Sequence, residues 1–316
     1  MTAWTQGDIP RLAGRTALVT GASSGLGLRA AEVLANRGAR VILTSRDPGR
    51  GALALARVRD AATGAPPEMV VLDLADLASI RAAAGNIRVL SHDRLDLLVN
   101  NAGVMAPPFA YSRDGIELQW ATNVFGPAAL TRRLLPALVR VPGSRVVTMS
   151  SLAHFLGAFD ATRLDSDVAG LHYSGLAYYC RTKLANLLAA RTLERYLRRA
   201  GAETISLSAH PGTTATRIAS DLVADRSPRA QRAANRIWGV FTQPVEVGVL
   251  PLLFAATAPG VRGAQYFGPS GIFETRGAPA AAARSFSARS ADLSDLLETR
   301  TIELTGLALS ERALHR

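Results

Sequence analysis

Short apolar runs alternate with longer amphipathic segments along the chain from residue 15 onward. The apolar runs are mostly continuous, which is typical of strands buried on both faces of a parallel sheet. They predict seven strands, at Thr16–Thr20, Arg40–Ser45, Met69–Asp73, Leu95–Asn100, Arg145–Ser150, Thr204–Ala209 and Ala264–Phe267. The clearest helices are predicted at Leu26–Arg37, Gly115–Val139 and Tyr178–Arg199. The pattern therefore predicts a single α/β domain, with a doubly wound, Rossmann-like parallel sheet of seven strands and helices on both faces.

Composition narrows the class of protein. The single cysteine, Cys180, excludes an internal disulfide and suits a reducing cytosol. The first residues lack an apolar signal core, and the longest apolar stretch, around Val247–Ala258, is too short to cross a bilayer. We therefore expect a cytoplasmic protein without a membrane span. The net charge of +11 comes from scattered arginines without an aromatic-interleaved basic stripe, so we expect a solvated surface rather than nucleic-acid binding.

A glycine-rich turn follows the first predicted strand and opens the first predicted helix. Its spacing, G-x-x-x-G-x-G, permits a tight turn and a close approach of the backbone to a pyrophosphate at the helix N-terminus. The alternative is a turn that only packs the helix against the strand. We expect a dinucleotide to contact Gly21, Ser23, Ser24, Gly25, Leu26 and Gly27.

The end of the second predicted strand bears on the identity of the dinucleotide. Nucleotide-binding folds hold the ribose 2′-hydroxyl near this position, and an arginine there would pair with a 2′-phosphate. Ser45 and Arg46 therefore indicate NADP(H). Asp47 is evidence for NAD(H), because its carboxylate could hold a ribose, although it could also cap the next helix. We expect NADP(H), with NAD(H) less favoured.

Other strand ends supply further candidate contacts to the cofactor. Asp73 and Leu74 end the third strand, where an adenine amino group would lie, but Asp73 could equally be the N-cap of a helix at Leu77–Ala84. The fourth strand ends in Asn100-Asn101-Ala102-Gly103, which can brace the strand end and border the cofactor. We include Asn101, Ala102 and Gly103 in the expected cofactor site.

Lys183, the only lysine in the chain, follows Tyr179 in a Y-x-x-x-K spacing. Residues i and i+4 share a helix face, so the phenol and the ammonium project into the same space. A nearby ammonium lowers a tyrosine pKa, which suits acid/base catalysis. The alternative is an exposed helix pair. The neighbouring Tyr178 lies five residues before Lys183 and therefore off the shared face.

Together these motifs resemble the short-chain dehydrogenase/reductase family. Their order covers nearly the whole chain: the glycine turn, Asp73-Leu74, Asn100-Asn101-Ala102-Gly103, Asn123, Ser150-Ser151, Tyr179-x-x-x-Lys183 and Pro211-Gly212. The strings from Ser150 to His154 and from Ala177 to Asn186 are similar to the retinol-dehydrogenase-like branch. The string from Gly268 to Glu274 is similar to bacterial members of that branch.

The resemblance implies roles for particular residues. Tyr179 would be the acid/base, Lys183 would lower its pKa and bind the nicotinamide ribose, and Ser151, rather than Ser150, would hold the substrate oxygen. Asn123 would hold a water in a proton relay, although it could instead bend its helix. The implied cofactor contacts after the sixth strand are Pro211, Gly212, Thr213 and Thr216, of which both threonines are also plausible helix caps.

With this tyrosine in place, neither His154 nor His210 is needed as a base, and no Cys/His cluster has metal-ligand spacing. We expect residues 1–14 to form an N-terminal extension and residues 276–316 to pack on the same domain. Residues 15–275 would form the dinucleotide-binding catalytic domain, with a substrate lid at about 213–243.

The apolar residues of that lid, together with Leu152–Leu176 and Pro107–Ile116, suggest a lipophilic carbonyl or alcohol substrate, unless they are ordinary core. The resemblance also implies a possible homodimer or tetramer, paired through the long helices at Gly115–Val139 and Tyr178–Arg199. The predicted function is an NADP(H)-dependent oxidoreductase that transfers a hydride between nicotinamide and a carbonyl or a primary or secondary alcohol. The alternative is a non-catalytic NADP(H)-binding sensor or scaffold with the same fold. Retention of both Tyr179 and Lys183 favours the enzyme.

Overall fold

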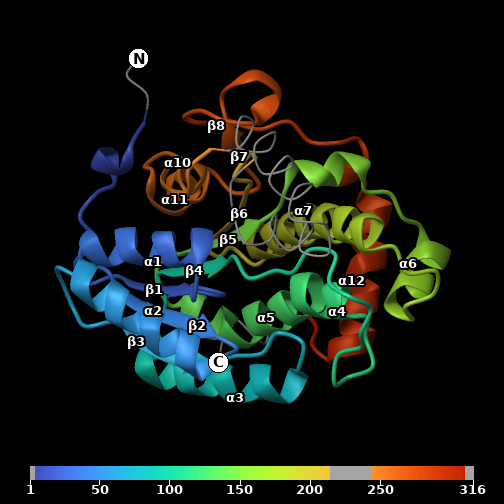
Figure 1. Ribbon diagram of the computed structural model, residues 1–316, viewed down its shortest axis with the longest axis horizontal. Helices are drawn as coiled ribbons and strands as arrows, with labels where there is room; N and C mark the ends of the chain where they lie inside the picture. The colour runs from blue at the N-terminus through green and yellow to red at the C-terminus, as the bar shows by residue number, and fades with distance from the viewer. Residues whose placement is uncertain (1–3, 214–242, 310–316) are drawn as a thin grey trace, which may run out of the picture.

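All eight strands of the described residues belong to one sheet, in the order β3-β2-β1-β4-β5-β6-β7-β8 (Figure 1). The computed structural model describes residues 4–213 and 243–309. The strands are β1 (Thr16–Val19), β2 (Arg40–Ser45), β3 (Glu68–Val71), β4 (Leu97–Asn100), β5 (Arg145–Met149), β6 (Ile205–Ala209), β7 (Tyr266–Pro269) and β8 (Pro279–Ala281). The chain order reverses between β1 and β4, and in such sheets ligands bind at the carboxyl ends of the strands beside that point.

The prediction of a doubly wound α/β sheet is confirmed, but the number of strands was wrong by one. Strands β1 to β7 pair in parallel, as expected. The eighth, β8, pairs antiparallel with β7, and Phe267 lies opposite Ala281. Its three residues, Pro-Ala-Ala, have little intrinsic preference for a strand, so the pairing with β7 is what makes them one.

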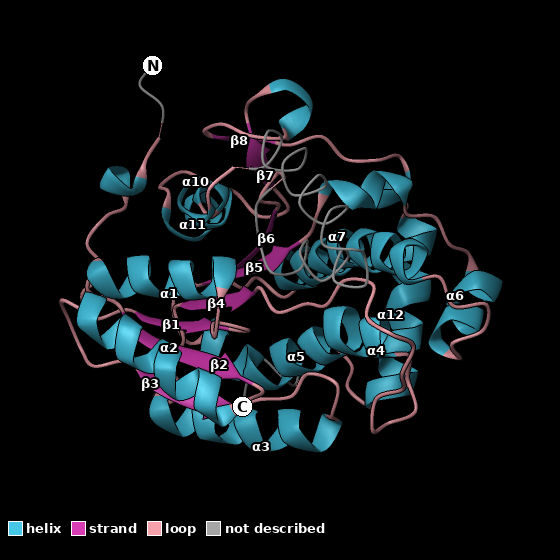
Figure 2. Ribbon diagram, in the orientation of Figure 1, coloured by secondary structure: helices cyan, strands magenta, loops and turns pink. Residues whose placement is uncertain are grey.

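Helices cover both faces of the sheet (Figure 2). One apolar core lies between the sheet and α1, α2 and α11, and a second lies between the sheet and α3, α5 and the C-terminal part of α7. The helices with α-helical geometry are α1 (Gly25–Asn36), α2 (Pro48–Ala61), α3 (Leu77–Leu90), α4 (Leu118–Trp120), α5 (Gly126–Val139), α6 (Ala161–Val168), α7 (Gly175–Arg199), α10 (Val245–Gly248), α11 (Leu250–Thr257) and α12 (Ala291–Thr305). Short helical turns are η1 (Gln6–Asp8), η2 (Ala121–Phe125), η3 (Leu152–Leu156), η4 (Ile272–Glu274) and η5 (Ser287–Arg289).

A third core joins the C-terminal helix to η2, α6 and α7. Buried residues of η2, α6, α7 and α12 form this core, with Trp120 and Tyr178 as its largest fully buried side chains. Arg132 of α5 forms an ion pair with Glu298 of α12, with 2.6 Å between Nη2 and Oε2. The C-terminal helix is therefore part of the domain's packing against α5 and α7.

The long helix expected at Gly115–Val139 begins later and is interrupted. Gly115 has a φ of 76°, a left-handed conformation outside a helix. Glu117 then caps α4, since its carboxylate accepts hydrogen bonds from the backbone N–H groups of Gln119 and Trp120 at 2.9 and 3.0 Å. A π-helical turn, η2, separates α4 from α5, and such turns are frequent at functional sites.

Two sequence-based predictions fall outside the described residues: Thr216 and nearly all of the proposed lid at 213–243. Among the residues that the structure does describe, no helix has the length and apolar character needed to cross a membrane.

Candidate active site

The glycine turn joins β1 to α1 at the reversal point of the sheet. Gly21 and Gly25 have φ values of 63° and 57°, which favour glycine. A Cβ on Gly21 would lie 2.8 Å from the Cα of Ala102, so the turn packs directly on the chain after β4. Ser24 is the N-cap of α1, and its side chain makes no capping hydrogen bond. The first turn of α1 therefore keeps the backbone N–H groups that an anionic group prefers, and the residues present fit a pyrophosphate.

The remaining residues of the turn differ in exposure. Ser23, Ser24 and Leu26 are partly exposed, whereas Gly27 is buried. A Cβ on Gly27 would lie 2.4 Å from Nδ2 of Asn101. That amide donates to the carbonyl oxygen of Thr20 at 2.9 Å. Asn101 and Gly27 thus hold the turn against β4, which is a bracing role.

Of the residues after β2, one is exposed to solvent and one caps the next helix. Arg46 is exposed. The Asp47 carboxylate accepts a hydrogen bond from the backbone N–H of Arg50 at 2.9 Å and caps α2. The buried Ser45 hydroxyl donates to the carbonyl oxygen of Asp47 at 2.8 Å. Asp47 is therefore engaged in capping, one of its two expected roles.

Asp73 is not the N-cap of the third helix, because Asp76 takes that position and caps the N–H groups of Ala78 and Ser79. The Asp73 carboxylate instead accepts from the N–H of Ala75 at 2.9 Å within the loop. Leu74 is buried beside Gly126, at the start of α5.

Ser151, Tyr179 and Lys183 come together where β5 ends and α7 passes over it. The Ser151 side chain lies close enough to the Tyr179 hydroxyl to act on its pKa. Nζ of Lys183 lies 5.5 Å from the centroid of the Tyr179 ring and donates to the carbonyl oxygen of Met149 at 3.3 Å. Ser150, the other serine of the pair, is buried, and its hydroxyl donates to the carbonyl oxygen of Lys183 at 2.8 Å. Ser150 thus ties β5 to α7, whereas Ser151 faces the tyrosine.

Asn123 completes the group from the π-helical turn. Its Oδ1 accepts from the N–H of Val104 at 2.8 Å, and its Nδ2 donates to the Val104 carbonyl oxygen at 2.9 Å and to Thr182 Oγ1 at 3.1 Å. A Cβ on Gly103 would lie 3.1 Å from Asn123 Oδ1 and 3.4 Å from Lys183 Nζ. Asn123, Gly103 and Lys183 therefore converge at one point of the cleft.

Burial dominates the charge states of the two central groups. It raises the pKa of Tyr179 to about 12, an effect that the nearby Ser151 side chain only partly offsets. It also lowers the pKa of Lys183 to about 8. The structure therefore differs from the expectation of a lowered tyrosine pKa, because desolvation of the phenolate is the largest effect on this group.

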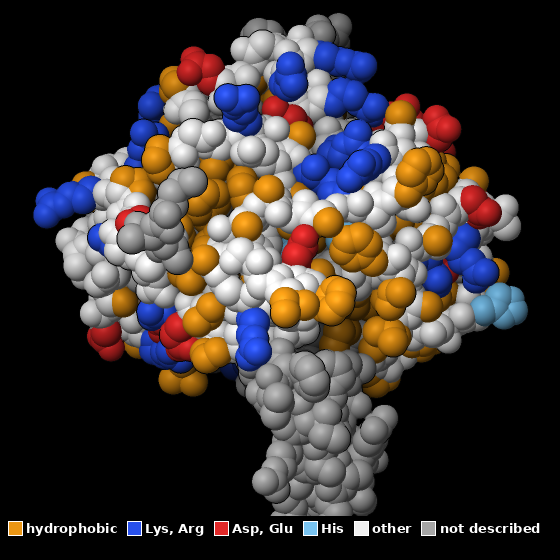
Figure 3. Space-filling model, turned by 90° about the horizontal axis from the view of Figure 1, so that it is seen from above, with side chains coloured by type: hydrophobic (Ala, Val, Ile, Leu, Met, Phe, Trp, Pro, Cys, Tyr) orange, Lys and Arg blue, Asp and Glu red, His pale blue; other side chains and the backbone are white. Residues whose placement is uncertain are grey.

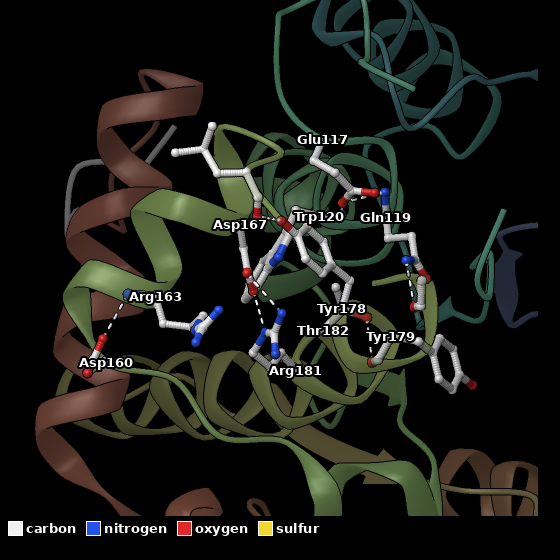
Figure 4. Close-up of polar contacts among 12 residues, drawn as sticks. Glu117, Gln119, Trp120, Asp160, Arg163, Asp167, Tyr178, Tyr179, Arg181 and Thr182 are labelled. Atoms are coloured by element: carbon white, nitrogen blue, oxygen red, sulfur yellow. Dashed lines mark hydrogen bonds and ion pairs between the residues drawn. The ribbon is translucent and has the colours of Figure 1, made fainter. Parts of the chain in front are cut away.

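Tyr178 takes no part in this constellation. Its hydroxyl donates to the carbonyl oxygen of Leu171 at 2.6 Å, and the Arg181 guanidinium lies 4.9 Å from its ring centroid. Arg181 in turn pairs with the buried Asp167 of α6. Figure 4 shows the two tyrosines pointing in different directions, Tyr178 toward Asp167 and Tyr179 away from it.

Sequence reasoning missed two polar residues that hold the site. Asn186, one turn after Lys183, donates to the same Met149 carbonyl oxygen at 2.9 Å. Gln119 accepts from the N–H of Ala106 at 3.0 Å and donates to the carbonyl oxygen of Gly175 at 2.9 Å, so it ties the wall after β4 to the start of α7. The i, i+3 spacing from Lys183 could have identified Asn186, whereas no local signal marks Gln119.

The turn after β6 is held by Thr275, at the end of η4, and by Gln243. Gly212 has a φ of 65°, and a Cβ there would lie 2.3 Å from the carbonyl oxygen of Thr275. The N–H of Thr213 donates to that oxygen at 2.9 Å. Gln243 donates to the carbonyl oxygen of Pro211 at 2.6 Å. Pro211, Gly212 and Thr213 therefore form an ordered wall beyond the strand ends.

The fold and the strand-end turn define a dinucleotide-binding α/β protein. Comparison with known proteins assigns the family: the family model described as short chain dehydrogenase matches residues 15–162. Retinol dehydrogenase 11 of Mus musculus is 39% identical over 252 residues, which cover 79% of this chain and 76% of that protein. Polyprenol dehydrogenase of Mus musculus is 38% identical over 262 residues, which cover 81% of this chain and 75% of that protein. The chain belongs to the short-chain dehydrogenase/reductase family, in its retinol-dehydrogenase-like branch.

A solved structure of an uncharacterized protein from Mycobacterium paratuberculosis matches with a TM-score of 0.79 and 34% identity. The match covers 98% of this chain and 100% of that one. The family is one of oxidoreductases that use nicotinamide cofactors, and the expected resemblance is confirmed at this level.

Proposed function

We propose that the protein is an NADP(H)-dependent oxidoreductase that interconverts a lipophilic carbonyl compound and its alcohol, with Tyr179 as the acid/base. The observation that carries the proposal is that Tyr179 lies beside both Ser151 and Lys183, with Lys183 Nζ 5.5 Å from the centroid of the tyrosine ring. The bound nicotinamide would supply or accept the hydride. The chain's own residues supply the proton and stabilise the charge.

During carbonyl reduction, negative charge develops on the substrate oxygen. A substrate oxygen placed between the two hydroxyls would receive hydrogen bonds from Ser151 and Tyr179, and Tyr179 would deliver its proton. A pKa of about 12 keeps the Tyr179 phenol protonated at neutral pH, which supports the role of proton donor and hence the direction of reduction. Lys183, with a pKa of about 8, still carries its charge at pH 7 and would stabilise the phenolate left behind.

The preference for NADP(H) rests on Arg46 and Asp47. An exposed guanidinium after β2 is available to a 2′-phosphate, because arginine and phosphate form strong charge-assisted hydrogen bonds. The Asp47 carboxylate is turned to the N-terminus of α2, which removes much of its value as a ribose ligand. Both observations favour NADP(H) over NAD(H).

Apolar side chains around the site support a lipophilic substrate. Phe155 and Leu156, just after Ser151, are 46% and 79% exposed, and Leu176, just before Tyr179, is 56% exposed. Figure 3 shows hydrophobic side chains gathered over the upper face of the molecule. The two relatives named above are dehydrogenases of retinol and of polyprenol, which are both long apolar alcohols.

The experiment is NADPH oxidation with all-trans-retinal and decanal, comparing wild type with Tyr179→Phe and Tyr178→Phe. We expect Tyr179→Phe to lower kcat by roughly 10²- to 10⁴-fold, the usual range for loss of a general acid. Tyr178→Phe is the matched control, because it removes a buried hydroxyl bonded only to a backbone carbonyl. An equally active Tyr179→Phe enzyme would defeat the mechanism. Tight NADPH binding without turnover of either aldehyde would favour the sensor alternative.

A further inference from the structure

Two fully buried histidines contact the turns that follow β5 and β6, and the proposed mechanism uses neither. His154 is in η3, three residues after Ser151, and His210 follows β6 immediately before Pro211 and Gly212. Burial lowers the pKa of both imidazoles, that of His210 to about 4. Both rings are therefore neutral at pH 7, and each has one N–H donor and one acceptor nitrogen.

The partners of His154 fix its tautomer. Nδ1 lies 2.7 Å from the carbonyl oxygen of Ser151, which can only accept, so Nδ1 carries the proton. Nε2 accepts from the backbone N–H of Ser285 at 3.3 Å. His154 thus links the backbone of Ser151 to Ser285, which belongs to residues 266–285. We call residues 266–285 the C-terminal segment.

His210 has the opposite tautomer. Nδ1 accepts from the backbone N–H of Gly212 at 3.2 Å, so the proton is on Nε2, which donates to Oε2 of Glu274 at 2.9 Å. The other oxygen of Glu274 accepts from the N–H of Ala283 at 2.7 Å. His210 thus links the turn expected to border the cofactor to the same C-terminal segment.

The C-terminal segment is shaped to receive the two rings. The Tyr266 ring lies between them, with centroids 5.6 Å from His154 and 5.2 Å from His210. A Cβ on Gly268 would lie 1.9 Å from His210 Nε2, so only glycine leaves room for the imidazole. Glu274 reaches His210 from a left-handed backbone, with φ of 54° after 52° at Phe273. Such strain persists only where surrounding contacts hold it, and it clusters at functional sites.

We propose that His154 and His210 are positioning residues that fix the catalytic-serine turn and the cofactor-side turn onto the segment 266–285. The inference rests on the proposed function, since it concerns the orientation of Ser151 for that reaction. His154 sets the direction of the Ser151 backbone and hence of its hydroxyl toward Tyr179. His210, through Glu274, fixes the position of the turn at Pro211 and Gly212 relative to residues 266–285.

The test uses kinetics of the full chain with NADPH and decanal for wild type, His154→Phe, His154→Asn and Glu274→Ala. His154→Phe keeps a ring but loses both hydrogen bonds, and we expect kcat to fall roughly 10- to 100-fold with an unchanged KM for NADPH. His154→Asn keeps a donor where Nδ1 stands, so it should recover most of kcat. Glu274→Ala should raise the KM for NADPH with a smaller effect on kcat. A purely structural role would move all three variants together.

Ser144→Ala is the matched control. It removes a buried hydroxyl that bonds to Leu138 and Thr204 at the opposite end of β5, and it should alter stability without a split between kcat and KM. Hydrogen exchange provides a readout independent of turnover. The amides of 151–157 should lose protection in His154→Phe but not in Ser144→Ala. Unchanged exchange there, or failure of His154→Asn to recover kcat, would overturn the positioning role. Absence of turnover in wild type would count against the proposed function alone, and exchange would still decide the role of His154.

Discussion

Asn123 holds both backbone polar groups of Val104, with 2.8 Å to the N–H and 2.9 Å to the carbonyl oxygen. Both N–H groups of the Asn123 amide are in use, since the second donates to Thr182. A water in the implied proton relay would therefore meet the backbone of the π-helical turn or the remaining lone pair of Oδ1. The side chain's direct effect is to fix the chain at Gly103 and Val104 beside Lys183.

We expect Asn123→Leu to lower the free energy of unfolding by about 1–3 kcal/mol, because it leaves the Val104 groups unpaired in a buried place. Activity should fall more than stability explains, since the wall beside Lys183 loses its anchor. Chemical denaturation and steady-state kinetics would measure the two effects. Thr131→Val, which removes a buried hydroxyl bonded to Asn100 and Pro127, is the control for stability loss alone. Equal activity losses in the two variants would contradict the anchoring role.

We expect the buried Lys183 to lower the free energy of unfolding. Its pKa is lowered to about 8, so between about pH 8 and the unfolded value of 10.5 the unfolded chain binds more protons, and stability rises with pH. One pKa unit corresponds to about 1.4 kcal/mol, so we expect Lys183→Met to raise the free energy of unfolding at pH 7 by about 1–3 kcal/mol. Asn186 still satisfies the Met149 carbonyl oxygen in this variant.

The measurement is urea denaturation of wild type and Lys183→Met from pH 7 to pH 10. The stability difference between Lys183→Met and wild type should shrink as pH rises. The Lys183→Met variant should also lose NADPH-dependent turnover. A less stable Met variant with an unchanged pH dependence would show that Lys183 supports the fold.

Arg46→Asp should reverse the choice of cofactor. The change removes a cation that could meet a 2′-phosphate and adds an anion that repels it, so we expect NADPH affinity to fall at least tenfold while NADH affinity holds or improves. Arg59→Asp, an exposed site in the last turn of α2, makes the same charge change away from the turn. Fluorescence titration with both nucleotides would measure the ratio. If the ratio of NADPH affinity to NADH affinity changed equally in both variants, the effect would be due to net charge.

The C-terminal helix bears on the expected homodimer or tetramer. No residue of α5 and none at 177–197 of α7 is exposed, and α12 packs across them. A pairing of subunits through those two helices would have to displace α12. We therefore expect light scattering to give the mass of a monomer over a wide concentration range. A dimer whose hydrogen-exchange protection falls on α5 and α7 would contradict this prediction.

Much of the fold was predictable because parallel strands buried on both faces have continuous apolar sequences, and β2 was predicted with its exact bounds. The π-helical turn at Ala121–Phe125 was not predictable, since its sequence has ordinary helical periodicity and Asn123 within it bonds to Val104, which is distant in the chain. The sequence placed Tyr179 and Lys183 on one helix face, and the structure agrees. It could not give the tyrosine pKa, because the opposing effects of burial and charge depend on packing. The ties from His154 and His210 to the C-terminal segment also arise from residues far apart in the chain.

Because Lys183 supplies the only ε-amino group and is 5% exposed, the molecule has no lysine on its surface. Amine-acylating reagents, which modify many lysines in most proteins, would modify one side chain here, in addition to the α-amino group. The rate at which that single mass increment appears would report how often solvent reaches the cleft. If NADPH slowed the acylation of Lys183, the nucleotide would be located beside this side chain without any knowledge of the substrate.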